Sequence, residues 1–378
     1  MASWESGVNR DPEAANRKRP ESGGVSRCRR DITMRHRVAL SFGFRHRTGL
    51  SVIGVSLVLL PVPLILSNPW KLGILNLIAI HAIVVLGLNL FIGYAGQISL
   101  GHAAFFGLGA YGSAILTTAF AVPPIAAMIL TAAGVGLVAL SIGIPVLRLS
   151  GHYLAMATLG FNIVVHNILI QWDRVTGGPS GLSGVPPFAL FSLFFQSELR
   201  QYYLLWGTAL VALTLSLNLV RSGVGRGLAA LAEDEVAAAA MGVDVRHGKI
   251  VVFTISAIFA AVSGSLFAHY MGTVTPDTFG IFASIDFLIM AVIGGMGSLW
   301  GSLAGAAIVT LLPHLLGPLE DSKDIIYGLS VVAILLLFPG GLLAGIAAEV
   351  KSRLARAGAN GQFPMAKSQL EQNLGRDP

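Results

Sequence analysis

The chain carries very little charge for its length. Only 12% of its 378 residues are Asp, Glu, Lys or Arg, whereas 54% are hydrophobic and the mean hydropathy is +0.73. A soluble globule of this size needs far more polar surface to face water. The composition therefore excludes an ordinary soluble domain and predicts an all-α integral membrane protein, part of whose surface is covered by lipid.

Cysteine is almost absent as well. Cys28 is the only one, and it lies in a basic stretch before the first apolar run. One cysteine forms no intramolecular disulfide and no metal-binding cluster. The histidines His81, His166, His269 and His314 have no metal-ligand spacing. We expect this chain to bind no metal and no cofactor.

Catalytic motifs are also missing. The sequence has no HExxH, no GxSxG and no pair of carboxylates in a glycine-rich pocket. The nearest approach to a phosphate-binding loop is Gly248-Lys249, but Val243 stands where the first glycine belongs and Ile250 follows the lysine. We therefore expect no enzyme activity and no ATP hydrolysis by this chain.

What the sequence does contain is a series of long apolar runs. A helix needs roughly 20 apolar residues to cross a bilayer core about 30 Å thick. The runs predict a polytopic bundle of about ten spans, or about eight if the short run 284–297 and its neighbour form a re-entrant hairpin. The runs are 50–67, 70–92, 99–120, 123–147, 154–172, 202–220, 250–271, 284–297, 299–317 and 325–343.

The chain termini are basic or polar. Residues 1–47 mix many arginines with Pro, Ser and Gly and predict a disordered tail, within which Met34 is an alternative start. The next run ends in Pro, Asn and Trp, unlike a signal-peptide cleavage site, so we expect a retained first helix. The expected domains are the tail 1–47, a transmembrane domain at 48–348 and a C-terminal tail at 349–378.

Positive charge predicts the orientation of the bundle in the membrane. From a cytoplasmic N-terminus, about ten crossings place Arg148, the charged segment 221–249 and the C-terminus in the cytoplasm. They place the loop 173–201 and an acidic patch outside, the patch being Glu320, Asp321 and Asp324. Either count of spans keeps this orientation, because the two counts differ by an even number.

Two glycine-rich segments, 93–112 and 294–305, lie in different halves of the chain. Paired glycine-interrupted apolar segments indicate a transport path, because broken helices expose polar backbone that protein or water must satisfy. In the first segment we favour the path over simple packing, although His102 also suits an interhelical hydrogen bond. The candidate path residues are Gly93, Gly96, Gln97, Ser99, His102, Gly294, Gly295 and Gly297.

The second segment has an alternative interpretation. Gly297, Gly301 and Gly305 are spaced as a GxxxGxxxG face, which brings two helices together without any ligand. For these three glycines we favour packing.

Asp286 is a further path candidate, because an ionisable side chain within an apolar run is costly. It lies one turn into the run that follows an outer loop. The alternative, which we slightly favour, is that its carboxylate caps a helix near the membrane interface.

The inner segment 221–249 is the most informative polar stretch. Residues 228–241 are strong helix formers, and Gly242 suits the left-handed position that ends a helix. Four alanines leave the helix surface open to close approach, and Glu233-Asp234-Glu235 offers charge to a basic partner. We expect this helix to dock into a partner's cleft rather than to be a solvated connector.

This acidic cluster, followed by alanines and a glycine, resembles the coupling helix of ABC importer permeases. Together with four other segments, it makes the chain similar to the branched-chain amino acid permease family, specifically its LivM-type subunits, over roughly residues 50–345. The four segments are 87–112, 147–160 with Gly151-His-Tyr-Leu-Ala, 176–182 with Thr-Gly-Gly-Pro-Ser-Gly-Leu, and 284–305.

The resemblance implies a permease subunit of an ABC importer for leucine, isoleucine and valine. Its expected partners are a homologous LivH-type permease, two cytoplasmic ATPases that use ATP and Mg²⁺, and a periplasmic binding protein. ATP-driven closure of the ATPases would move the helix 228–241 and switch the bundle between inward and outward access. The residues implied in coupling are Arg226, Glu233, Glu235, Ala239 and Gly242.

Two alternatives stay open. One is an ABC permease for urea or short amides, because Pro179-Ser180 and His152 depart from the usual family pattern. The other is an ion-coupled secondary transporter, which would need intramembrane acids, and only Asp286 competes for that role.

Overall fold

The computed structural model describes residues 54, 56–57, 59–65, 68–190, 193–194, 197–315 and 323–337. The chain forms two units, Met1–Val55 and Ser56–Pro378, and every element below belongs to the second. The predicted tails 1–47 and 349–378, part of the run 50–67 and the acidic residues Glu320 and Asp321 lie outside the described residues.

The described part of the second unit is mainly helical, in line with the all-α prediction. The longer helices are α4 (Pro69–Asn89), α5 (His102–Thr118), α6 (Pro124–Val146), α7 (His152–Gln171), α9 (Glu198–Arg221), α12 (Val245–Met271) and α14 (Leu299–Leu315). The shorter ones are α3 (Val62–Ile65), α8 (Asp173–Thr176), α10 (Gly223–Glu233), α11 (Glu235–Ala240), α13 (Ile281–Gly294) and α15 (Lys323–Leu337).

Short elements complete the chain. A π-helical turn, η2 (Leu90–Tyr94), extends α4, and two 3₁₀ turns are η3 (Gly178–Ser180) and η4 (Pro276–Phe279). Strand β1 (Leu182–Ser183) pairs antiparallel with β4 (Thr273–Val274), and β2 (Ala189–Leu190) pairs with β3 (Leu193–Phe194).

Helix boundaries follow local chemistry. The side chain of Asn68 accepts a hydrogen bond from the second residue of α4, and Ser197 and Asp244 cap α9 and α12 in the same way. Such caps satisfy backbone N–H groups that a helix start leaves without partners. Gly272 ends α12 in the left-handed conformation, with φ of 71°.

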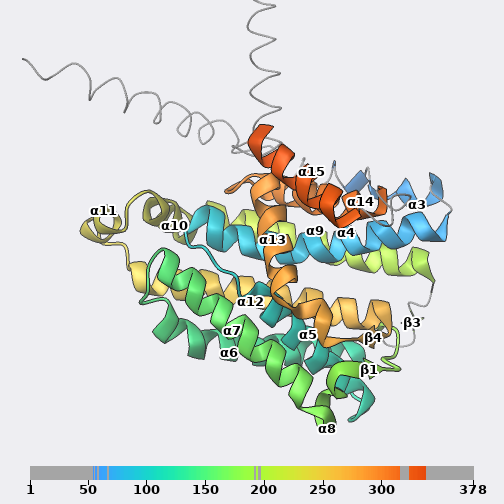
Figure 1. The fold of residues 1–378 in the computed structure, drawn as a ribbon. Helices are drawn as coiled ribbons and strands as arrows, with labels where there is room; N and C mark the ends of the chain where they lie inside the picture. The colour runs from blue at the N-terminus through green and yellow to red at the C-terminus, as the bar shows by residue number, and fades with distance from the viewer. Residues whose placement is uncertain are drawn as a thin grey trace, which may run out of the picture. The chain divides into compact units, whose positions relative to one another are not determined.

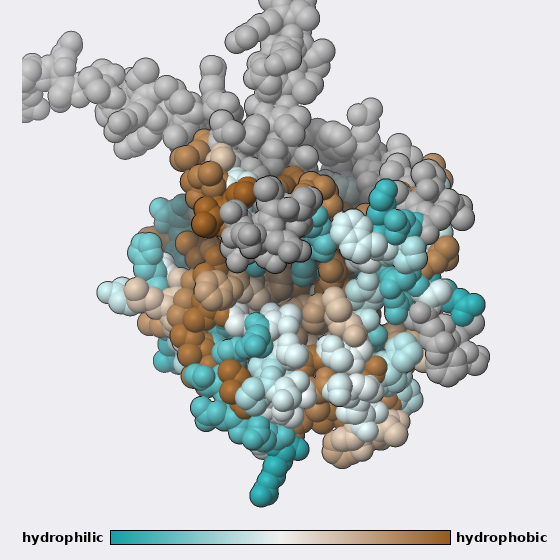
Figure 2. Space-filling model, turned by 45° about the vertical axis from the view of Figure 1, so that its right-hand side comes forward, coloured by the Kyte–Doolittle hydropathy of each residue, from teal (hydrophilic) through white to brown (hydrophobic). Residues whose placement is uncertain are grey.

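Five described helices are long and apolar enough to cross a membrane: α4 with η2, α6, α7, α9 and α12. Helices α13 and α14 are apolar but shorter. Figure 1 shows the five long helices running roughly side by side, with α10 and α11 at one end and α8, β1 and β4 at the other, while α13 crosses them. Figure 2 shows apolar side chains gathered in a band on one face, as a lipid-covered surface requires.

The core lies where α4, α5 and α12 meet. The most apolar stretch is 83% buried in α4 and 67% in α12, against 28% in α7 and 33% in α6 and α9. Helices α5 and α12 approach closely at Gly109 and Gly264, where an added β-carbon would overlap the backbone of the other helix. Small residues at such crossings let membrane helices pack tightly.

Candidate transport and coupling site

The predicted coupling region consists of two short helices, α10 and α11, which together with Met241 and Gly242 we call the coupling segment. The prediction of one helix over 228–241 is therefore wrong. Helix α10 ends at Glu233, and Asp234 takes an extended conformation with φ of −159°. The Asp234 carboxylate then accepts hydrogen bonds from Val236 N and Ala237 N at 2.8 and 3.1 Å. A residue that caps a helix must itself leave the helical conformation, so this acid breaks the predicted helix in two.

Most predicted coupling residues lie on the exposed side of this segment. They are Arg226, Glu233, Ala239 and Gly242. Gly242 has φ of 83°, the left-handed conformation predicted for the helix end. Beside them the apolar side chains of Val236 and Met241 are 79% and 85% exposed. Exposed apolar side chains next to charge are typical of a protein-binding surface.

Glu235 points in the other direction, toward the bundle. Its Oε1 atom accepts hydrogen bonds from Gln97 Nε2 at 3.0 Å and from Lys249 Nζ at 2.6 Å. Lys249, in the first turns of α12, is only 4% exposed, whereas the Glu235 side chain keeps 40% of its surface exposed. One carboxylate oxygen thus joins α11 to α12 and to a predicted path residue.

Gln97 lies in a break between helices. Residues 95–101 connect η2 to α5 without helical structure, and we call them the broken segment. Gly96 has φ of 68°, and a β-carbon there would lie 3.2 Å from Ala232 Cα in α10. The broken segment therefore rests directly on the coupling segment, which sequence patterns alone did not indicate.

The two glycine-rich segments meet at Asn89. Its amide nitrogen donates to Ser298 O at 2.9 Å and to Ser302 Oγ at 2.7 Å, and its oxygen accepts from Gly297 N at 2.8 Å. Asn89 is fully buried, and a β-carbon on Gly93 would overlap the Gly297 backbone. A single buried amide thus holds the turn between α13 and α14 against η2.

The predicted GxxxGxxxG packing face holds only in part. Gly301 and Gly305 lie on α14 and touch the backbone of α13 at Gly294. Gly297 precedes α14 and has φ of 80°, and Gly295 likewise lies in the turn with φ of 105°. The three glycines of the spacing therefore do not share one helix face, because the helix begins only at Leu299.

His102 opens α5 and is 1% exposed. Its Nε2 atom lies 3.1 Å from Ser256 Oγ on α12, and its Nδ1 atom has no hydrogen-bond partner among the described residues. The nearby Ser99 Oγ accepts from Gly101 N at 3.3 Å. The interhelical hydrogen bond foreseen for His102 is present, beside an unused ring nitrogen.

Side chains from two other helices accept hydrogen bonds from backbone N–H groups at the start of α5. Thr158 Oγ1 of α7 accepts from Leu100 N at 3.0 Å, and Ser284 Oγ of α13 accepts from Ala103 N at 3.1 Å. Asn162 Nδ2 of α7 donates to the same Ser284 oxygen at 3.3 Å. Three helices therefore converge at this end of α5.

Asp286 does not take part in the hydrogen bonds described above for the other path candidates. The favoured capping interpretation is wrong, because Asp286 lies within α13, and Gly280, which precedes that helix, makes no side-chain cap. The carboxylate instead accepts a hydrogen bond from Tyr327 OH of α15 at 3.0 Å.

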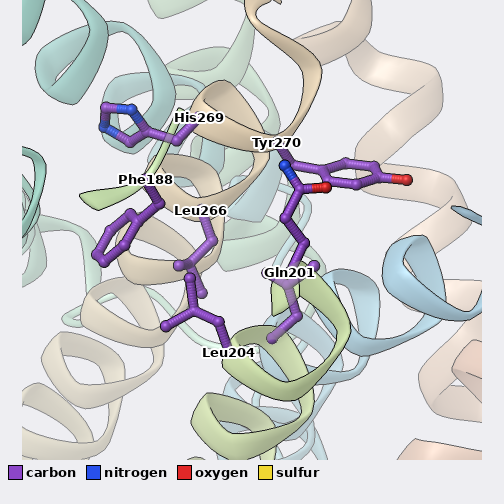
Figure 3. A pocket seen from close by; sticks show the side chains of 7 residues that line it. Phe188, Gln201, Leu204, Leu266, His269 and Tyr270 are labelled. Atoms are coloured by element: carbon purple, nitrogen blue, oxygen red, sulfur yellow. The ribbon is translucent and has the colours of Figure 1, made fainter. Parts of the chain in front are cut away.

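The described residues also contain a small pocket between α9 and α12, at the end of the bundle opposite the coupling segment. Its lining comprises Phe188, Gln201, Leu204, Leu205, Leu266, His269 and Tyr270 (Figure 3). Both ring nitrogens of His269 already have partners, Ser113 Oγ at 2.9 Å and Pro186 O at 2.7 Å. No predicted path residue lines this pocket.

Several residues of the site escaped prediction. Asn89, Asn162 and Lys249 stand out only as polar residues in or beside apolar runs, which costs free energy and so marks a functional candidate. Thr158 and Ser284 carry no comparable signal, because Ser and Thr hydroxyls in a helix can donate to a backbone carbonyl of the same helix.

Groups of three or more His, Cys, Asp or Glu that suit a metal ion are absent from the described residues.

The chain is similar to known proteins over most of its length. Residues 71–348 match the family described as branched-chain amino acid transport system / permease component. The chain is 33% identical to the high-affinity branched-chain amino acid transport system permease protein LivM of Escherichia coli K12, over 74% of this chain and 73% of that protein. It is 26% identical to the LivH permease protein of the same system and strain, over 70% of this chain and 91% of that protein. No solved structure matches the chain.

Proposed function

Because the chain belongs to the family of branched-chain amino acid transport permeases, we propose that it is one permease subunit of an ABC importer for leucine, isoleucine and valine. The relatives LivM and LivH are both named for this substrate class. The chain itself carries no ATPase motif.

The proposed assembly contains this chain, a LivH-type permease, two cytoplasmic ATPases and a periplasmic binding protein. The ATPases use ATP and Mg²⁺ and dock on α10 and α11, where Val236 and Met241 are exposed beside acidic side chains. This end of the bundle then lies in the cytoplasm, together with both chain termini. Arg221, Arg226 and Arg246 at the same end agree with the excess of positive charge on cytoplasmic loops.

The proposed topology has eight to ten spans in the bacterial inner membrane: about ten if α13 and α14 both cross, and about eight if they form a re-entrant hairpin. Their close glycine contacts and the turn held by Asn89 favour the hairpin as one packed unit.

The observation that carries the coupling proposal is the Glu235 carboxylate shared by Gln97 and Lys249. When the ATPases close, they displace α10 and α11. Glu235 joins these helices to the broken segment and to α12. We therefore propose that the coupling segment, the broken segment and α12 move as one body. The path, proposed to run past the broken segment and the start of α5, then changes its access from one side to the other.

The test is uptake of labelled leucine by proteoliposomes that hold the complete importer with its binding protein. We expect ATP-dependent uptake with the wild-type chain and its loss with Glu235→Arg, which places a cation against Lys249, or with Gly242→Pro, which cannot adopt a positive φ. Lys249→Arg keeps the ion pair and is the matched control. Uptake that neither variant alters would contradict the coupling role of Glu235.

The same vesicles separate the alternatives. Uptake of urea or short amides in place of leucine would support the amide permease. Leucine uptake that follows an ion gradient without ATP would support a secondary transporter, and Asp286→Asn would then abolish it.

A further inference from the structure

Helix α7 touches the rest of its unit along a narrow seam. Its buried residues are Leu154, Thr158, Asn162, Val165 and Leu169. Two of these are polar, although the most apolar stretch of the helix is only 28% buried. Polar side chains are costly inside a membrane. Two buried polar residues on a helix with few contacts are therefore candidates for a functional role.

The polar groups of the seam are not all satisfied. Asn162 is 0% exposed, yet its Oδ1 atom has no hydrogen-bond partner among the described residues. Its other amide atom donates to Ser284 Oγ, which also accepts from the first-turn N–H of Ala103 in α5. A buried acceptor without a partner is destabilising, which makes it a candidate ligand-binding atom.

Apolar walls flank these polar atoms. The rings of Phe105 and Phe161 lie with their centroids 5.1 Å apart, on α5 and α7 respectively. Phe105 also packs edge-on against Phe253 of α12, with centroids 5.5 Å apart. A β-carbon at Gly101 would lie 3.6 Å from the Phe161 ring, so this aromatic cluster borders the start of α5.

We propose that this seam is a subsite for the head group of a zwitterionic α-amino acid. The α-carboxylate accepts the first-turn N–H of Ala103, where the helix dipole favours an anion. The α-ammonium donates to Asn162 Oδ1, and the branched side chain lies against Phe105 and Phe161. Discontinuous membrane helices in transporters use their N-termini for anionic solute groups in the same way.

A solute can bind in this seam only after Ser284 releases Ala103 N. Ser284 Oγ lies where the carboxylate would bind, as a neutral acceptor for Ala103 N. Opening requires α7 and α13 to separate from α5. Helix α7 is suited to this motion because it buries the smallest share of its apolar stretch among the five long helices.

This inference rests on the proposed function, and its test uses the complete importer in proteoliposomes. The measured quantity is leucine transported per ATP hydrolysed. Asn162→Ala should lower it about tenfold, because a hydrogen bond to a charged group is lost, while ATP hydrolysis stimulated by the loaded binding protein stays within about twofold. Asn162→Leu, which is close in length and has no hydrogen-bond acceptor, carries the same expectation.

Asn76→Ala is the matched control. Asn76 is also 0% exposed, and its Oδ1 atom also lacks a partner among the described residues, but it bonds Glu198 and not the seam. Leucine per ATP should stay at the wild-type value in Asn76→Ala. An equal loss in Asn76→Ala, or no loss in both Asn162 variants, overturns the subsite. A wild-type importer that moves no leucine instead contradicts the proposed function.

Discussion

Helices α4 and α7 are both apolar enough to cross a membrane, but they are held in opposite ways. Their mean hydropathies are 2.3 and 1.6, whereas 83% of the stretch in α4 and 28% of that in α7 is buried. The buried amide of Asn89 in α4 bonds several backbone and side-chain groups, while Asn162 in α7 keeps one unpartnered atom. We infer that α4 belongs to the fixed part of the bundle, which we call the frame. Helix α7 moves relative to the frame, and we call it the wall.

The largest effect is expected in the frame. A β-carbon at Gly93 would overlap Gly297 N and Asn89 Oδ1, so Gly93→Ala must displace the turn between α13 and α14. The expected cost exceeds about 4 kcal/mol, in the range of severe overpacking and lost buried hydrogen bonds. The yield of complex that co-purifies with the partner subunits should fall sharply. Wild-type yield would show that α4 is not held rigidly at this position.

Asn89→Leu should have the next largest effect. It removes partners from Gly297 N, Ser298 O and Ser302 Oγ, at about 1–3 kcal/mol for each buried group left unsatisfied. Thermal unfolding of the detergent-solubilised complex should shift to clearly lower temperature. The same change at the exposed Asn167 of α7 is the control and should leave the transition in place. Equal shifts in both variants would remove the distinction between frame and wall.

A smaller effect is expected where α7 meets the broken segment. Thr158→Val keeps the side-chain shape but removes the acceptor of Leu100 N, at about 1–3 kcal/mol. The complex should still assemble, and hydrogen exchange in residues 95–101 should accelerate. Unchanged exchange would mean that Thr158 does not hold this segment.

The smallest effect is expected at Gly160 on α7. A β-carbon there meets nothing within 4 Å, so Gly160→Ala should leave uptake unchanged and stabilise the helix by about 0.5–1 kcal/mol. Thermal unfolding and leucine uptake are the two measurements. Loss of assembly would reveal a tight contact of α7 with another subunit and would end its description as a wall free to move.

The sequence predicted the apolar helices and the break in the first glycine-rich segment, because hydropathy and glycine content are local properties. For Gly297 it favoured a helix-packing face, whereas this glycine lies in the turn before α14. It also predicted the left-handed Gly242. It missed the break at Asp234. An aspartate within a run of helix-forming residues can either continue the helix or cap a new one, and the choice depends on the contacts of the surrounding fold.

Contacts between distant segments were not predicted from the sequence at all. Gln97 and Glu235 were assigned to different roles, path and coupling, yet they share a hydrogen bond of 3.0 Å. Gly93 and Gly297 touch although they lie in opposite halves of the chain. Such meetings depend on how α4, α12 and α13 pack, and no periodicity in a single segment contains that information.

The central claim, that the coupling segment and the broken segment move as one body, has a direct test. A β-carbon at Gly96 would lie 3.4 Å from Ala232 Cβ, close to the spacing that a disulfide requires. Gly96→Cys and Ala232→Cys, combined with Cys28→Ser, allow the two segments to be cross-linked by oxidation.

The measurement is ATP-dependent leucine uptake by the complete importer before and after this cross-link forms. If the segments move together, locking them leaves uptake at the level of the reduced variant. Uptake that stops on oxidation and returns on reduction would show that the coupling segment slides over the broken segment, and would contradict the account.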